Sequence, residues 1–125
     1  MKFFNRIFRR KQNADIPPMP AWNTIVEMMY DKQLDTFADE VVDVIYSKDR
    51  SKRYVILKKA NDLLTYQLES IYQFDEDEWN YIGSYDNALP AMWEPFRGIA
   101  GKSIFNSIKE LRNEIENEPE YRQYF

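Results

Sequence analysis

The sequence contains no histidine and no cysteine among its 125 residues. Nucleophilic serine or cysteine sites that depend on a histidine base are therefore excluded. Zinc sites built from cysteine and histidine, iron–sulfur clusters and disulfides are excluded for the same reason. Only carboxylates, amines, hydroxyls and aromatic rings remain for chemistry. We therefore expect a protein without enzyme activity, without a metal and without a cofactor.

Long apolar runs are also missing. No stretch approaches the roughly 18 apolar residues that a membrane-spanning helix needs. The apolar residues near the N-terminus never run together for the roughly 7–15 positions of a signal-peptide core. The sequence thus predicts neither a transmembrane segment nor a secretory signal, and the lack of cysteine fits a reducing cytoplasm.

Charge is distributed unevenly along the chain. Residues 1–14 hold five basic groups and no acidic one, whereas residues 15–125 hold twelve basic and twenty-one acidic groups, a net charge of −9. Phosphate binding needs a cationic face, so residues 15–125 are poorly suited to nucleic acid. An acidic surface instead attracts a protein partner with a basic surface. Simple solubility is the alternative explanation for the excess of acid.

Residues 1–14 have the pattern of a short basic amphipathic helix, in which apolar residues share one side and cations fill the flanks. The candidate membrane contacts are Phe3, Phe4, Ile7, Phe8, Arg9 and Arg10. One such helix binds anionic lipid weakly and reversibly. A frayed tail, or a helix docked on the rest of the chain, is the alternative. We expect a cytoplasmic location. If the leader binds lipid, the protein will lie at the inner membrane surface.

Prolines separate the leader from a single domain over residues 21–125. Residues 15–20 form a proline-rich linker, because the residue before each proline is pushed to extended geometry. Within the domain, apolar spacing predicts a helix over residues 21–32. Alternating β-branched and aromatic residues predict strands over 41–46, 53–58, 63–74 and 79–82. The short connections favour an antiparallel meander, and strand 63–74 is expected to have one buried and one solvated face.

The C-terminal third begins with residues 83–102, which hold all three glycines and two prolines and are expected to be an irregular loop. Ser103 then suits the N-cap of an amphipathic helix that ends at Glu118-Pro119. The aromatic residues of the final segment, 120–125, are expected to dock on the domain. Together these elements predict an α+β domain, with an antiparallel meander sheet of about four strands and helices packed on one face.

The most distinctive local feature is a run of four acids before a tryptophan, Asp75 to Trp79. It does not match a calcium-binding EF-hand loop, whose fifth and sixth positions would be Trp79 and Asn80 here. Carboxylates adjacent in sequence also rarely face each other across a substrate. A solvated hairpin loop is the simplest interpretation. The alternative is a partner-binding edge, because aromatic rings among carboxylates fit a cationic partner. Its candidate residues are Asp75, Glu76, Asp77, Glu78, Trp79, Tyr81, Tyr85 and Asp86.

Two further features have plainer interpretations. Trp93 is predicted to be a core side chain that pins the long loop, because large aromatic rings dominate core burial. The basic turn over residues 48–53 lacks a glycine-rich cradle and precedes a strand, so it is not a P-loop. We expect it to be an exposed hairpin tip.

Three segments occur in a suggestive order. The first is the hairpin Tyr46–Leu57, and the second is the acidic tryptophan turn Phe74–Ile82. The third contains Trp93-Glu94-Pro95, Ser103-Ile104-Phe105 and the aromatic ending Glu118–Phe125. Together they resemble, over roughly residues 20–125, the small immunity proteins that accompany bacterial polymorphic or contact-dependent toxins. The resemblance implies a cytoplasmic protein that binds and blocks a cognate toxin without catalysis. The alternative function is a peripheral membrane-associated adaptor tethered by the basic N-terminus.

Overall fold

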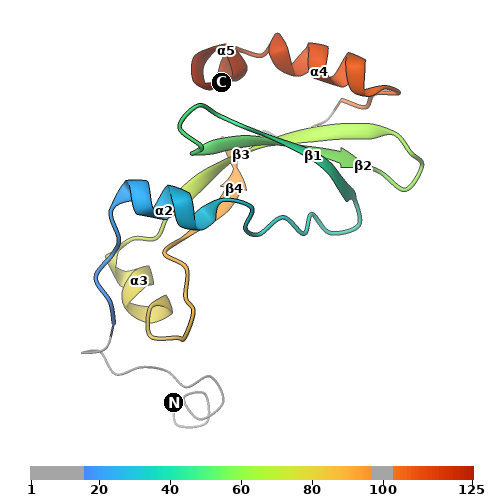
Figure 1. The fold of residues 1–125 in the computed structure, drawn as a ribbon. Coiled ribbons are helices and arrows are strands. Elements are labelled where there is room, and N and C mark those ends of the chain that lie inside the picture. The colour runs from blue at the N-terminus through green and yellow to red at the C-terminus, as the bar shows by residue number, and fades with distance from the viewer. Residues whose placement is uncertain (1–15, 97–102) are drawn as a thin grey trace. The chain divides into compact units, whose positions relative to one another are not determined.

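The structure, a computed structural model, describes residues 16–96 and 103–125 (Figure 1). The predicted leader over residues 1–14, with its candidate membrane contacts, lies outside these residues. The chain divides into two compact units, each described here by itself. One comprises residues 1–30 and 72–92, and its described residues hold six acidic and no basic side chains. We call it the acidic unit. The other, the sheet unit, comprises residues 31–71 and 93–125.

The chain has an α+β fold with one four-stranded antiparallel sheet in the order β1-β2-β3-β4. The strands are β1 (Glu40–Tyr46), β2 (Lys52–Lys58), β3 (Leu64–Gln73) and β4 (Ala91–Pro95). The first three confirm the predicted strands, and consecutive pairs of them form the expected meander. The prediction of a fourth strand over 79–82 is wrong, because these residues belong to helix α3 (Glu76–Ile82). The fourth strand, β4, lies instead within the segment expected to be a loop.

One face of the sheet unit carries a hydrophobic core beneath two C-terminal helices, α4 (Ile108–Glu116) and α5 (Pro119–Tyr124) (Figure 1). Leu111 and Ile115 of α4 are fully buried against the strands. The buried members of this core are Tyr54, Ile56, Leu64, Tyr66, Leu68, Leu111 and Ile115. Full burial of one large apolar side chain contributes about 1.5–3 kcal/mol. The expected packing of helices on one face of the sheet is therefore confirmed for this unit.

The C-terminal helix begins later than its sequence suggested. Ser107, not Ser103, is its N-cap, and its hydroxyl accepts a hydrogen bond from the amide of Glu110 at 3.2 Å. The segment before it pairs with β3 instead, because Phe105 and Leu64 exchange two backbone hydrogen bonds of 2.8 and 2.9 Å. The tail is also helical, since Pro119 occupies the first turn of α5 and needs no amide partner there.

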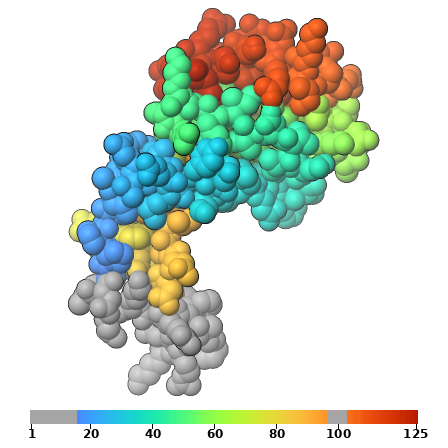
Figure 2. Space-filling model, viewed as in Figure 1, coloured from blue at the N-terminus to red at the C-terminus, as the bar shows by residue number. Residues whose placement is uncertain are grey.

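Tyr121 and Phe125 pack on the core of the sheet unit, which confirms the docking predicted for the aromatic tail. The turn between β1 and β2 lies against α5 (Figure 2), where the Lys48 amide donates to the Tyr124 carbonyl at 3.1 Å. Tyr124 also contacts Lys52, whose ammonium lies 4.1 Å from the ring centroid.

The β1–β2 turn is ordered by a carboxylate rather than by its basic residues. Asp49 accepts hydrogen bonds from the Ser47 hydroxyl, the Ser51 amide and the Ser51 hydroxyl at 2.7–2.9 Å. Partial burial raises the pKa of Asp49. The hydrogen bonds from Ser51 and Ser47 and the charge of Lys52 outweigh this effect, so the pKa lies below its ordinary value. Ser51 and Arg53 are buried, so the prediction of an exposed tip over residues 48–53 holds only for residues 48–50.

The opposite face of the sheet is not solvated, and that expectation is wrong. Thr65 and Glu69 of β3 are 4% and 6% exposed, and Arg53 of β2 is fully buried. Trp93 of β4 is 2% exposed, which confirms its prediction as a core side chain. The Arg53–Glu69 ion pair and the Trp93 ring thus lie on the face of the sheet that the alternation along β3 predicted to be solvated.

Candidate functional site

The acidic run begins a helix because its own side chains cap that helix. An Asp75 carboxylate oxygen accepts a hydrogen bond from the Glu78 amide at 2.8 Å. A Glu78 carboxylate oxygen accepts one from the Asp75 amide, also at 2.8 Å. This reciprocal arrangement is a capping box, and each acid in the first turn adds about 0.3–1 kcal/mol through the helix dipole. These interactions explain why the residues after Asp75 form α3 rather than the predicted strand.

Glu78 also ties the start of α3 to the end of β3. Its carboxylate accepts a hydrogen bond of 2.5 Å from the Tyr72 hydroxyl. Nearby, the Phe74 amide donates to the Pro90 carbonyl at 3.0 Å. A carboxylate with these partners is a structural group in the acidic unit, so Glu78 is not a free charge on its surface.

Trp79 lines a pocket in the acidic unit. Its side chain is 6% exposed, and its indole nitrogen donates to the Pro17 carbonyl at 2.8 Å. Gly83 lies directly behind it, where a Cβ would come within 2.8 Å of the Trp79 carbonyl oxygen. The same Cβ would lie 3.1 Å from Ile16 and from the indole ring. Only glycine fits here without a shift of the Trp79 carbonyl.

The pocket has a volume of about 490 Å³. Its lining residues are Ile16, Pro17, Pro18, Met19, Gln73, Phe74, Asp75, Glu76, Trp79 and Asn80. The apolar walls come mainly from the proline-rich segment, Phe74 and Trp79, while Asp75 and Glu76 supply carboxylates. The arrangement suits an apolar side chain whose own neighbours carry positive charge.

The structure distributes the eight predicted binding residues over several environments. Asp75, Glu76 and Trp79 line the pocket. Asp77 and Asp86 are exposed, whereas Glu78 is half-buried. Tyr81 and Tyr85 form a separate aromatic pair with ring centroids 5.7 Å apart, joined by a hydroxyl–hydroxyl hydrogen bond of 3.2 Å. Three of the eight candidates therefore meet at one cavity.

Sequence reasoning missed the other wall of this pocket. Residues 15–20 are predicted to be a linker because of their prolines, yet Ile16 to Met19 line the cavity. The available signal was the presence of Ile16 and Met19 next to the prolines, since a plain linker has little need of large apolar side chains. No pattern in the chain links them to Trp79, which lies 63 residues after Ile16 and 60 after Met19.

A second feature that sequence reasoning missed is a buried polar network in the sheet unit. The Arg53 guanidinium donates to Glu69 at 2.7 Å, to the Lys32 carbonyl at 3.0 Å and to the Tyr46 hydroxyl at 3.3 Å. It also lies over the Trp93 ring, 4.0 Å from the centroid. All three polar contacts and the cation–π contact stabilise the charge of a side chain that has no access to water. The network is therefore part of the folded core of the sheet unit.

The carboxylates are arranged for capping and pairing rather than for holding a cation. Within residues 16–96 and 103–125, no group of three or more acidic side chains is placed to bind a metal ion. No helix in the same residues has the length and apolar character needed to cross a membrane.

Comparisons of the chain with protein-family models, curated proteins and solved structures find no match. The function is therefore inferred from the geometry, burial and charge of the described residues.

Proposed function

We propose that this chain is a non-catalytic binding protein, an immunity protein that neutralises a cognate bacterial toxin in the cytoplasm. Its contact surface is the acidic unit, with the pocket over Trp79 at its centre. The toxin surface is basic and inserts an apolar side chain into that pocket.

The observation that carries this proposal is an apolar pocket with carboxylates among its lining residues. The described residues of the acidic unit hold Glu27, Asp75, Glu76, Asp77, Glu78 and Asp86, and no lysine or arginine. The carboxylates gathered in these residues attract a basic protein and repel an acidic one. Charge alone gives little specificity, so the 490 Å³ cavity adds the shape that selects one partner.

A toxin that binds nucleic acid fits this surface. It needs a cationic cleft to hold phosphate, and the same cations would meet the carboxylates of the acidic unit. Occupying that cleft would exclude the substrate without any chemistry by the inhibitor.

Reversing two exposed charges tests the proposal. We expect Glu76→Lys with Asp77→Lys to weaken binding of the toxin encoded by the adjacent gene by about tenfold or more, since two favourable charges become repulsive. Calorimetry with the full chain measures the dissociation constant. Asp75 and Glu78 are left unchanged because their hydrogen bonds form the cap of α3.

The matched control reverses Glu110 and Glu116, two exposed acids on α4 in the sheet unit. This variant has the same net charge as the first and also reverses an acid in a first helical turn. It should bind the toxin like the unchanged chain. Equal weakening by both variants, or by neither, would contradict the proposed surface.

The basic leader supports a second candidate function, a peripheral adaptor at the inner membrane surface. Residues 1–14 hold five cations and the apolar residues Phe3, Phe4, Ile7 and Phe8, and the segment that follows has a net charge of −9. If the leader is a tether, the full chain will sediment with vesicles containing anionic lipid, and a chain starting at Asp15 will not. Neutral vesicles are the control. Equal sedimentation of the two chains would rule out the tether.

A further inference from the structure

Phe37 is the most exposed large apolar side chain in the part of the chain that the structure describes. It is 96% exposed, whereas the next most exposed, Ile104, is 54% exposed. It stands in the loop between α2 (Trp22–Met29) and β1. A phenylalanine left almost entirely in water gains nothing for the fold, because the hydrophobic effect rewards only the area that is removed from water.

The backbone at Phe37 is held in an unfavourable conformation. Its φ is 65°, a left-handed value that aromatic residues rarely adopt. Two hydrogen bonds fix the turn around it, from the Phe37 amide to the Asp35 carbonyl at 2.7 Å and from the Asp39 amide to the Thr36 carbonyl at 3.4 Å. Backbone strain of this kind costs on the order of 1–3 kcal/mol and persists only where the surroundings enforce it.

The loop that carries Phe37 is fixed to the sheet unit at its start. The Gln33 side-chain amide pairs with the backbone of Trp93, donating at 3.0 Å and accepting at 2.8 Å. It thereby occupies the backbone groups of β4 at that residue as a neighbouring strand would. Gln33 itself has a φ of 52°. A separate contact fixes Asp31, whose backbone amide donates a hydrogen bond to the Tyr46 hydroxyl at 3.0 Å.

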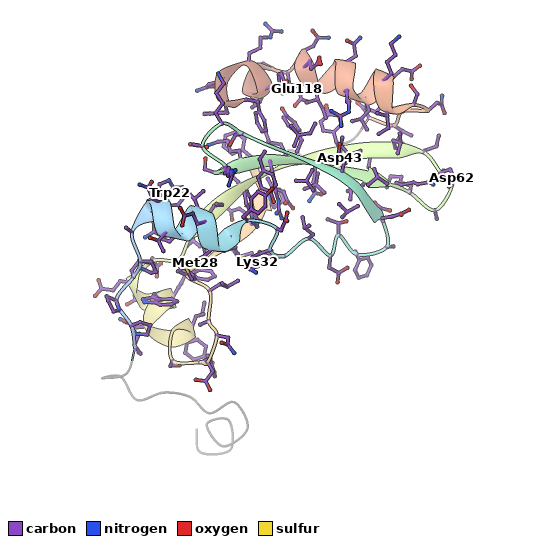
Figure 3. The ribbon with its side chains drawn as sticks, viewed as in Figure 1. Trp22, Met28, Lys32, Asp43, Asp62 and Glu118 are labelled. Carbon is purple, nitrogen blue, oxygen red and sulfur yellow. The ribbon has the colours of Figure 1, made fainter. Side chains whose placement is uncertain are left out.

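The buried Arg53 completes the anchor, since its guanidinium donates to the carbonyl of Lys32, which Figure 3 labels at the start of this loop. At the far end, the Lys59 ammonium lies 3.5 Å from the carboxylate of Asp39. The loop that displays Phe37 is thus fixed at both ends to the sheet unit. The hydrogen bond from Arg53 to Lys32 therefore gives part of the buried network a role in fixing this loop.

We propose that Phe37 is the anchor of a protein-docking surface in the sheet unit, and that it inserts into an apolar pocket of a protein partner whose rim is basic. An aromatic side chain presented on a fixed loop binds with little further loss of conformational entropy. The charge of the rim follows from the acids around Phe37. Asp35 and Glu40 are exposed beside it, whereas the charge of Asp39 is matched by Lys59. Anionic lipid would be repelled by the same acids, so the partner is a protein rather than a membrane.

The proposal does not depend on the toxin interaction, because it concerns the sheet unit alone. A photo-reactive phenylalanine analogue, p-benzoylphenylalanine, is introduced at Phe37 in the full chain within the cells that produce it. The matched control carries it at Val42, a 40% exposed apolar residue of β1. We expect one protein to crosslink from position 37 and not from position 42. Mass spectrometry identifies that protein, which is then purified.

Affinity for the purified protein decides the outcome. Phe37→Ala should raise the dissociation constant by about tenfold or more, while Val42→Ala leaves it within about twofold. The proposal would be overturned if position 37 crosslinked to nothing, or only to lipid or a second copy of the chain. It would also be overturned if positions 37 and 42 gave equal crosslinks. Unchanged affinity of Phe37→Ala would do the same.

A measurement without any partner gives an independent check. Asparagine tolerates a left-handed backbone better than phenylalanine. Phe37→Asn should therefore leave the midpoint of thermal unfolding unchanged or raise it. A lower midpoint would show that the ring stabilises the fold, and Phe37 would then not be held out for a partner.

Discussion

Replacing Arg53 with methionine is expected to destabilise the sheet unit by about 3–5 kcal/mol, since removing one partner leaves the other as an uncompensated buried charge. Glu69 is 6% exposed and would then keep the hydrogen bond of 2.6 Å from the side-chain amide of Gln67. The substitution also leaves the Lys32 carbonyl without the donor that Arg53 supplies. Most single substitutions cost about 1 kcal/mol, so this loss would stand apart.

Urea unfolding followed by circular dichroism measures the change. Tryptophan fluorescence adds a local signal, because the guanidinium lies over the Trp93 ring. Lys58→Met is the control, since Lys58 belongs to the same strand and pairs with Asp62 in an exposed ion pair of 3.5 Å. Exposed pairs of this kind contribute about 0–1 kcal/mol, and the control should remain close to the unchanged chain.

A double variant separates the charge from the hydrogen bonds. Arg53→Met with Glu69→Leu removes both ions, and replacing a complete buried pair with apolar side chains is often neutral or stabilising. We expect the double variant to recover most of the stability lost in Arg53→Met. If it remained as unstable as the single variant, the contacts to Lys32 and Tyr46 would be the main contribution of Arg53, contrary to this account.

The strands that could be predicted from the sequence are those in which local pattern and environment agree. Residues 41–46 and 53–58 alternate β-branched and aromatic side chains, and they form β1 and β2. Residues 79–82 are also aromatic and β-branched in part, yet the capping box between Asp75 and Glu78 turns them into α3. The spacing Asp-x-x-Glu was visible in the sequence and, given its known role, would have corrected the prediction.

The two sites depended on contacts that no local pattern records. Arg53 ends a basic turn that is predicted to be exposed. It is buried because it contacts Glu69 and Trp93, which lie 16 and 40 residues further along the chain. Likewise, the pocket over Trp79 needed Ile16 and Pro17 from a segment interpreted as a linker. Burial decides the role of such residues, and burial is set by the tertiary fold rather than by neighbours in the sequence.

Glu118 is the second residue whose loss should have a large effect. It lies between α4 and α5, above the sheet (Figure 3), and its carboxylate accepts hydrogen bonds from the Tyr54 hydroxyl at 2.7 Å and the Tyr66 hydroxyl at 2.6 Å. Both tyrosines belong to the buried core. Glu118→Leu removes the acceptor of two buried donors, each costing about 1–3 kcal/mol when left unpaired. Glu116→Leu, at an exposed position of α4, is the matched control.

The same cluster predicts how stability depends on pH. Burial, the hydrogen bonds donated to Glu118 and the nearby negative charge of that carboxylate raise the pKa of Tyr54 and of Tyr66 well above 10. The unfolded chain releases these two protons near pH 10 while the folded protein retains them. The free energy of unfolding is therefore undiminished below about pH 10 and falls as the pH rises, by about 1.4 kcal/mol per pH unit for each tyrosine.

Urea unfolding at several pH values between 9 and about 12 measures this slope, and absorbance at about 295 nm reports tyrosine ionisation. In Tyr54→Phe with Tyr66→Phe, the slope due to these two groups should disappear, although the variant is less stable at neutral pH because Glu118 loses both donors. Tyr30→Phe, an exposed position in the acidic unit, is the control and should retain the slope. If the double variant kept the full alkaline slope, other groups would have to release the protons. The Tyr54–Glu118–Tyr66 cluster would then not be the origin of alkaline unfolding.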